Sequence, residues 1–231
     1  GVAVMEDDKM AAEYTVNHKK THSQTLMPMV DEVLRMLEIK PNELDAIAVS
    51  SGPGSFTGLR IGAASAKGLA MAIDKPMIAI PTLEALAYNI YGFRGYIVPV
   101  MDARRSQVYT GVYEFDEDGN MHTAMDGAAM GLDELMEKLN GFDGKLCFLG
   151  DGVAVYRERI LSALGQRVSF APNHLMHQHA GAVGALALKA YREGRYMKAE
   201  DMRPEYFRKS QAERERESSL NDGADPRDDR G

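Results

Sequence analysis

Apolar positions in residues 1–95 follow strand spacing and then helix spacing. Two short apolar runs, Val2–Met5 and Met10–Val16, flank an acidic turn and predict a β-hairpin. Apolar side chains three and four residues apart over His22–Leu37 predict an amphipathic helix, and Pro28 marks either its start or a kink. The next predicted elements are a strand, a helix, a strand and a helix, over Leu44–Ser50, Thr57–Ile73, Met77–Ile80 and Thr82–Tyr91.

The pattern restarts at Gly95, so the order of hairpin, helices and strands occurs twice. The strands predicted here are Tyr96–Met101, Gln107–Phe115, Lys145–Leu149 and Val168–Phe170. The helices predicted here are Leu132–Leu139, Val153–Leu164 and Ala180–Tyr191. We therefore predict an α/β fold of two similar units with mixed sheets flanked by helices, over residues 1–95 and 96–215. The last helix of the second unit is a candidate to pack back on the first, and the polar residues 216–231 predict a disordered tail.

A glycine-rich segment, residues 50–62, joins a predicted buried strand (Ala46–Val49) to a helix. A strand, a glycine-rich turn and a helix N-terminus are the usual platform for a phosphate group. The chemistry of the two common fingerprints is missing: Leu59 and Arg60 replace the Lys and Ser or Thr of a P-loop, and Thr57 replaces the third glycine of the dinucleotide pattern. The candidates for a vestigial nucleotide or phosphate site are Gly52, Gly54, Ser55, Thr57 and Asp102.

The helix after this turn is rich in small residues and includes Gly62 and Gly68. Glycine inside a helix costs about 1 kcal/mol relative to alanine, so two glycines usually mark close packing. Two interpretations stay open: the helix packs tightly on its own sheet, or a partner helix also approaches it. Both can hold, because the small residues are spread around the helix.

Histidines form two groups that could be considered as metal ligands, His18 with His22 and His174 with His177 and His179. Neither group has a carboxylate or a thiolate close by in the sequence. We therefore interpret the first group as a solvated helix entrance. The second group suits capping, surface hydrogen bonds or contact with a partner, and no metal site is predicted.

Asp102 follows a predicted strand and precedes Arg104 and Arg105. An aspartate at a strand end can position a metal or a water beside phosphate, but a structural turn residue is the simpler interpretation. The arginines could pair with phosphate or with a partner's carboxylate. The Gly-x-Ser-x-Gly pattern of a nucleophile elbow is missing, and Ser55 is better placed as a helix N-cap than as a nucleophile.

Composition narrows the class of protein. The formal net charge is −7 over 231 residues, so the surface as a whole is not built to hold a polyanion, although a local basic patch stays open. The single cysteine, Cys147, excludes an internal disulfide and suits a reducing compartment.

Several segments together resemble one family, the bacterial TsaB (YeaZ) proteins. The resemblance covers Val2 to Glu213, and the glycine-rich signature is its most specific part. The segments that carry it are His22–Gln24 with Leu26 and Pro28, Ser51–Gly62, Pro81–Glu84, Met101–Arg105 with Val108–Tyr109, and Pro204–Tyr206 through Arg208 to Ala212–Glu213.

The resemblance implies two tandem ribonuclease-H-like units of the actin, Hsp70 and sugar-kinase (ASKHA) superfamily. It also implies a non-catalytic subunit of the complex that forms N6-threonylcarbamoyladenosine beside the anticodon of tRNAs reading ANN codons. The implied partners are TsaD, the paralogue that transfers the threonylcarbamoyl group, and TsaE, an ATPase. The chain alone is expected to be a cytoplasmic homodimer with no membrane contact and only indirect tRNA contact.

The resemblance further implies that helices of the first unit bind the partner. The expected interface residues are His22, Leu26, Met29, Val33, Arg60, Ala63, Ala64, Lys67 and Met71. No intrinsic cofactor is expected, while ATP or ADP could bind at a subunit interface of the complex. TsaD-like enzymes hold a metal on a later helix of the first unit with a His-x-x-x-His pair, which Thr82–Tyr91 does not contain.

Two rival functions remain. One is a nucleotide-dependent phosphotransferase or ATPase of the same superfamily, using the glycine-rich turn and Asp102. The other is a metalloprotease, which requires a set of metal ligands that we do not find in the sequence. Family members also begin with a strand that ends in Asp-Thr-Ser, which this sequence lacks before Val2. We therefore expect about a dozen further residues upstream in the natural protein, enough for one strand and a turn.

Overall fold

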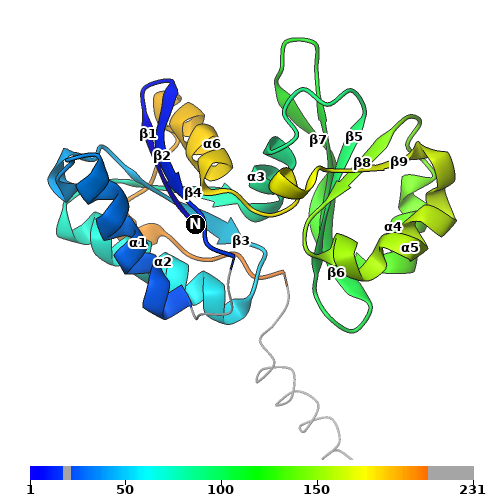
Figure 1. Cartoon of the computed structure of the whole chain (residues 1–231), viewed down its shortest axis with the longest axis horizontal. Coiled ribbons are helices and arrows are strands. Elements are labelled where there is room, and N and C mark those ends of the chain that lie inside the picture. The colour runs from blue at the N-terminus through cyan, green and yellow to red at the C-terminus, as the bar shows by residue number, and fades with distance from the viewer. Residues whose placement is uncertain (18–21, 208–231) are drawn as a thin grey trace, which may run out of the picture.

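The computed structural model describes residues 1–17 and 22–207. The predicted tail 216–231 and His18 lie outside the described residues. Figure 1 shows two α/β units side by side, with α3 between them. None of the helices in the described part of the chain is long and apolar enough to cross a bilayer.

The first unit contains two separate two-stranded sheets. Strands β1 and β2 form an antiparallel hairpin, while β3 and β4 pair in parallel. Its strands are β1 (Val2–Glu6), β2 (Lys9–Tyr14), β3 (Ile47–Gly52) and β4 (Met77–Pro81). Its helices are α1 (His22–Met36), α2 (Phe56–Ala72) and α3 (Thr82–Tyr88).

The second unit contains one five-stranded sheet in the order β7-β6-β5-β8-β9. The β7-β6-β5 part is antiparallel and the β5-β8-β9 part is parallel. Its strands are β5 (Tyr96–Asp102), β6 (Gln107–Phe115), β7 (Met121–Gly131), β8 (Leu146–Leu149) and β9 (Val168–Phe170). Its helices are α4 (Leu132–Leu139) and α5 (Gly152–Leu164), whereas the next helix of the chain, α6 (Ala180–Arg192), packs on the first unit.

The two units repeat one plan, an antiparallel hairpin and a parallel strand pair. In the second unit, β5 joins the two parts, because it is antiparallel to β6 and parallel to β8. Within the described residues of the first unit no strand takes that central place, so its sheet is divided in two. Helix α6 contacts strands of both small sheets. The topology confirms the predicted α/β class, and the sheet of the second unit is mixed and flanked by helices.

One prediction about a strand was wrong, and one strand was missed. The first half of β3 is only half-buried, although Ala46–Val49 was expected to be a buried strand. Ile47 and Val49 pack on the α2 side and Ala46 and Ala48 on the α6 side, but neither side covers them completely. Strand β7 was not predicted at all, because its side chains do not alternate and it lies at the edge of the sheet.

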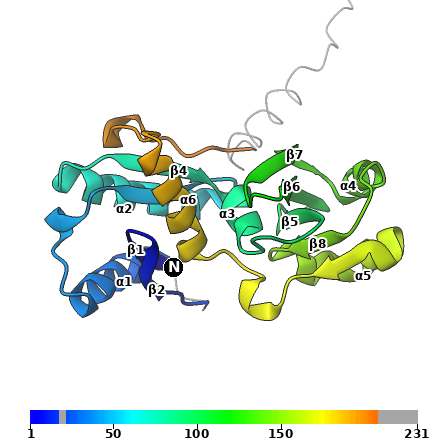
Figure 2. The ribbon, with the colours of Figure 1, turned by 90° about the horizontal axis from the view of Figure 1, so that it is seen from above.

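Both faces of the five-stranded sheet are covered by helices. One face packs its core residues, such as Phe148, against α4 and α5. The other packs against Leu83 and Leu86 of α3. Figure 2, seen from above, shows α4 and α5 on the outer side of the second unit. Helix α3 therefore lies in the junction between the two units.

Candidate functional site

Helix α2 leaves one stripe of its surface exposed. The helix begins at Ser55, which is the N-cap that the sequence predicted: the Gly58 amide donates to its Oγ over 3.4 Å. Ala63 and Ala70 face inward and are buried. The exposed stripe, which we call the α2 stripe, consists of Thr57, Arg60, Ala64, Gly68 and Met71.

The two helical glycines of α2 have open space beside them. A Cβ atom added at Gly62 or Gly68 would meet no heavy atom within 4 Å. Close packing inside this chain therefore does not explain either glycine. Small residues on an open helix face would allow another backbone to approach closely.

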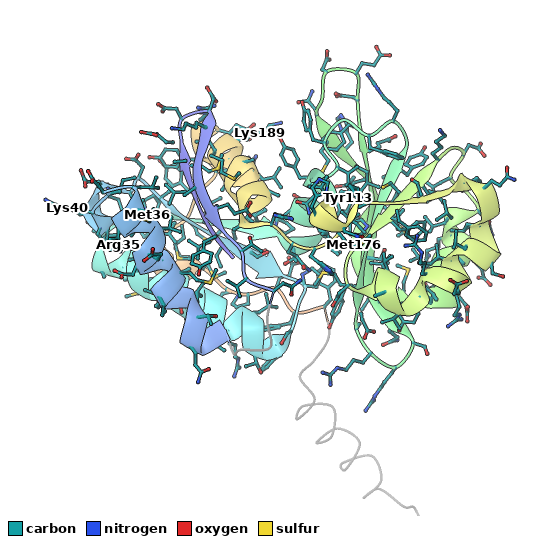
Figure 3. The ribbon with its side chains drawn as sticks, in the orientation of Figure 1. Arg35, Met36, Lys40, Tyr113, Met176 and Lys189 are labelled. Carbon is teal, nitrogen blue, oxygen red and sulfur yellow. The ribbon has the colours of Figure 1, made fainter. Side chains whose placement is uncertain are left out.

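Large apolar side chains are exposed on the same pair of helices. Met27 and Met36 of α1 are 45% and 68% exposed, and Met71 of α2 is 56% exposed. Helices α1 and α2 contact each other, so these methionines belong to one helix pair. Figure 3 shows Met36, with Arg35 and Lys40, at the outer end of the first unit.

The residues expected at the partner interface lie at different depths. Arg60, Ala64 and Met71 are exposed, while Leu26 and Lys67 are half-buried. The side chain of His22 lies outside the described residues. The remaining three expected residues, Met29, Val33 and Ala63, are buried. Their side chains support the helix pair from within the chain and do not form part of its surface.

The glycine-rich turn packs against the chain's own C-terminal segment. We call residues 197–207 the strap. The Glu205 amide donates to the carbonyl oxygen of Ser51 over 2.7 Å. Gly52 has a φ of 126°, and a Cβ atom there would collide with the backbone carbonyl of Glu205. A close approach by the strap, rather than by a phosphate, therefore explains Gly52.

The other phosphate candidates do not converge. The three atoms nearest to a Cβ atom at Gly54 would all belong to Leu59, at ordinary contact distances, and Thr57 is exposed. Asp102 makes its hydrogen bonds within the second unit, accepting from the Arg104 amide at 2.9 Å and the Tyr156 hydroxyl at 3.2 Å. These bonds are those of a structural turn residue.

The histidines near α6 connect it to the hairpin. His179 Nε2 lies 2.6 Å from the carbonyl oxygen of His174, and its Nδ1 lies 3.3 Å from a Glu13 carboxylate oxygen. The Gly181 amide donates to the same carboxylate over 3.1 Å. Among the described residues, no group of His, Cys, Asp and Glu side chains is arranged to hold a metal ion.

Tyr113 and the carboxyl group of Glu84 lie in the junction between the units. Figure 3 labels Tyr113 there, above Met176. Burial is the main cause that raises the pKa of the Tyr113 hydroxyl, and the charges of Glu84 and Asp126 add to it. Burial also raises the pKa of Glu84; Arg195 opposes this shift and Glu205 adds to it. Neither the strap nor this junction gave a signal in the hydrophobic pattern, because both depend on contacts between distant segments.

Comparison with known proteins adds to this geometry. A Bacillus subtilis protein, "tRNA threonylcarbamoyladenosine biosynthesis protein TsaB", is 38% identical over 167 residues, which cover 72% of this chain and 72% of that protein. The chain belongs to the TsaB family. The Escherichia coli protein of the same name is 27% identical over 91% of this chain and 90% of its own length.

A family model described as tRNA N6-adenosine threonylcarbamoyltransferase (TsaD) also matches residues 10–216. Among solved structures, YeaZ from Pseudomonas aeruginosa has a TM-score of 0.72 and 30% identity, over 88% of this chain and 92% of that one. The TsaB-family fold therefore extends through both units.

Proposed function

We propose that this TsaB-family chain is a non-catalytic subunit of the complex that forms N6-threonylcarbamoyladenosine in tRNAs reading ANN codons. It binds a TsaD-like transferase through α1 and α2. The observation that carries the proposal is the exposed α2 stripe, whose small residues share one helix face with the exposed Met71.

The surface chemistry of this helix pair suits a protein partner. Exposed apolar patches on a folded chain usually mark interaction sites, and methionine adapts its shape to a partner surface. On the α2 stripe, Ala64 and Gly68 share one face and leave room for a second helix to approach. The isolated chain uses the same helices to form a homodimer, which the transferase replaces.

The proposal extends to the remaining parts of the complex. A TsaE-like ATPase joins the pair, and ATP or ADP binds at a subunit interface rather than to this chain alone. The net charge of −7 supports a subunit that leaves most tRNA contact to others. The complex works in the cytoplasm.

A non-catalytic role is supported by the structural contacts of two residues that were candidates for a phosphate site. Gly52 accommodates the strap, and Asp102 accepts hydrogen bonds inside a turn. The rival function, a phosphotransferase or ATPase using these residues, requires them to face one substrate. Nucleotide hydrolysis by the purified chain, at a rate abolished by Asp102→Asn, would favour the rival.

Depletion of the gene tests the function in cells. The nucleosides of total tRNA are then measured by mass spectrometry, and threonylcarbamoyladenosine is expected to fall. The wild-type chain and Val155→Arg should restore it, whereas Met71→Arg should not. Val155 is the matched control, because it is an apolar residue of α5 with 61% exposure. An unchanged level of the modified nucleoside after depletion would refute the function.

A further inference from the structure

Arg60 is a guanidinium without an acidic partner in the described part of the chain. It lies on the exposed α2 stripe, and none of the ion pairs among residues 1–17 and 22–207 includes it. The neighbouring helix shows the contrast, because Arg35 of α1 pairs with Glu32 at 2.6 Å. Arg60 therefore has its N–H donors available to a group outside the described chain.

The Arg60 side chain is nevertheless held in place. Its guanidinium carbon lies 4.3 Å from the centre of the Phe56 ring, one turn earlier on α2. The Phe56 ring in turn packs on the Tyr206 ring, with 4.9 Å between ring centres. A guanidinium stacked on an aromatic ring keeps its plane fixed and its donors free at the edge.

The strap fixes the Tyr206 end of this stack. Next to Tyr206, the Glu205 amide donates to the Ser51 carbonyl oxygen. Further back, Lys67 Nζ of α2 donates to the Glu200 carbonyl oxygen over 2.8 Å. The strap is thus tied to both ends of the segment that carries Phe56 and Arg60.

We infer that Arg60 binds a carboxylate on a helix of the partner subunit, and that Tyr206 is a positioning residue that holds Arg60 for this contact. A fixed guanidinium fork matches a carboxylate with two parallel hydrogen bonds. Ala64 and Gly68 follow Arg60 at intervals of four residues on the same stripe, so a partner helix can come close enough for this contact. The inference rests on the proposed function, since it requires that the α2 stripe meets a partner.

Calorimetric titration of the full-length chain with the TsaD-like transferase tests the contact. Arg60→Ala should raise the Kd on the order of tenfold, as truncation of an interface residue that contributes strongly does. It should also reduce the dependence of the Kd on salt, because one charge pair is lost. Arg60→Lys keeps the charge but not the fork, so it should fall between. The matched control is Arg157→Ala, because Arg157 of α5 stacks on Phe170 at 3.9 Å in the second unit.

The role of Tyr206 has its own test. Tyr206→Ala should weaken binding several-fold although Arg60 is still present, and Tyr206→Phe should restore it because the ring is kept. Thermal unfolding checks that each variant is folded. Wild-type affinity in Arg60→Ala would overturn the carboxylate contact, and wild-type affinity in Tyr206→Ala would overturn the positioning role. A wild-type chain that does not bind the transferase would instead overturn the proposed function.

Discussion

Gly52 adopts a φ of 126°, in a region that L side chains rarely enter, and it lies directly against the Glu205 backbone. Gly54, two residues away, has only ordinary contact with Leu59. Two glycines that look equivalent in the motif therefore have different roles. Sequence reasoning found the motif and the Ser55 cap, but it could not find the strap, which is separated from the turn by about 150 residues of chain.

Alanine substitution separates the two glycines. Gly52→Ala should lower the free energy of unfolding by about 2–4 kcal/mol, because it adds backbone strain and a collision with the strap. Gly54→Ala should stay close to wild type. Urea unfolding followed by circular dichroism measures both. Equal effects of the two substitutions would contradict the role assigned to the strap.

The carboxyl group of Glu84 makes the stability of the folded chain depend on pH in a direction that can be predicted. Because its pKa is raised in the folded chain, mainly by burial, the folded state binds a proton more tightly than the unfolded state. The contribution of Glu84 to the stability of the folded state is therefore complete at pH values below its unfolded pKa, which is about 4.5. This contribution is lost as the pH rises through the folded pKa.

Glu84→Gln should therefore raise the stability at neutral pH by at most about 1 kcal/mol, since the site is partly solvated. It should also flatten the stability profile above pH 4.5, the reference pKa of this group. Glu117→Gln, in an exposed turn, is the control. A loss of stability at neutral pH in Glu84→Gln would contradict this prediction, because it would mean that the attraction of Arg195 for the carboxylate outweighs the cost of burial.

At the scale of elements, periodicity was sufficient for most helices and strands. The bounds of α4 and β9 agree with the sequence prediction, because apolar spacing and clear turn residues define both. Strand β7 was not predicted from the sequence, because an edge strand needs no alternating apolar face. Three residues expected at the partner interface, Met29, Val33 and Ala63, are buried inside the chain. The sequence could not show this, because periodicity identifies an apolar face but not which neighbour covers it.

Gly68 lowers the stability of helix α2 because it is a glycine inside a helix, and the space beside it is open. Gly68→Ala should stabilise the isolated chain by about 1 kcal/mol, because alanine favours helix and nothing in the chain lies within 4 Å of the new Cβ. The same substitution should weaken binding of the transferase by a few-fold, because the partner helix must move away. Chemical denaturation and calorimetry measure the two effects. A destabilised chain would show that Gly68 already packs closely.

At the scale of the whole molecule, the two units share one plan but differ in completeness. The second unit has a continuous five-stranded sheet, whereas the first has two small sheets covered by α6. The strap joins the units: it pairs with β4 through Met197 and Met77, and Phe207 packs against Tyr109 of β6 with 6.2 Å between ring centres. In Figure 1 it runs, in orange, from the first unit towards the second. The strap thus connects α2, through Tyr206 and Phe56, with the second unit, through Phe207 and Tyr109.

Binding of the purified TsaD-like transferase should depend on the α2 stripe. Size-exclusion chromatography with light scattering compares the wild-type chain, Met71→Arg and Val155→Arg. We predict that the wild-type chain and Val155→Arg form a complex with the transferase, and that Met71→Arg, which is altered on the α2 stripe, remains separate. A wild-type chain that forms no complex, or a Met71→Arg variant that binds as the wild type does, would contradict the account.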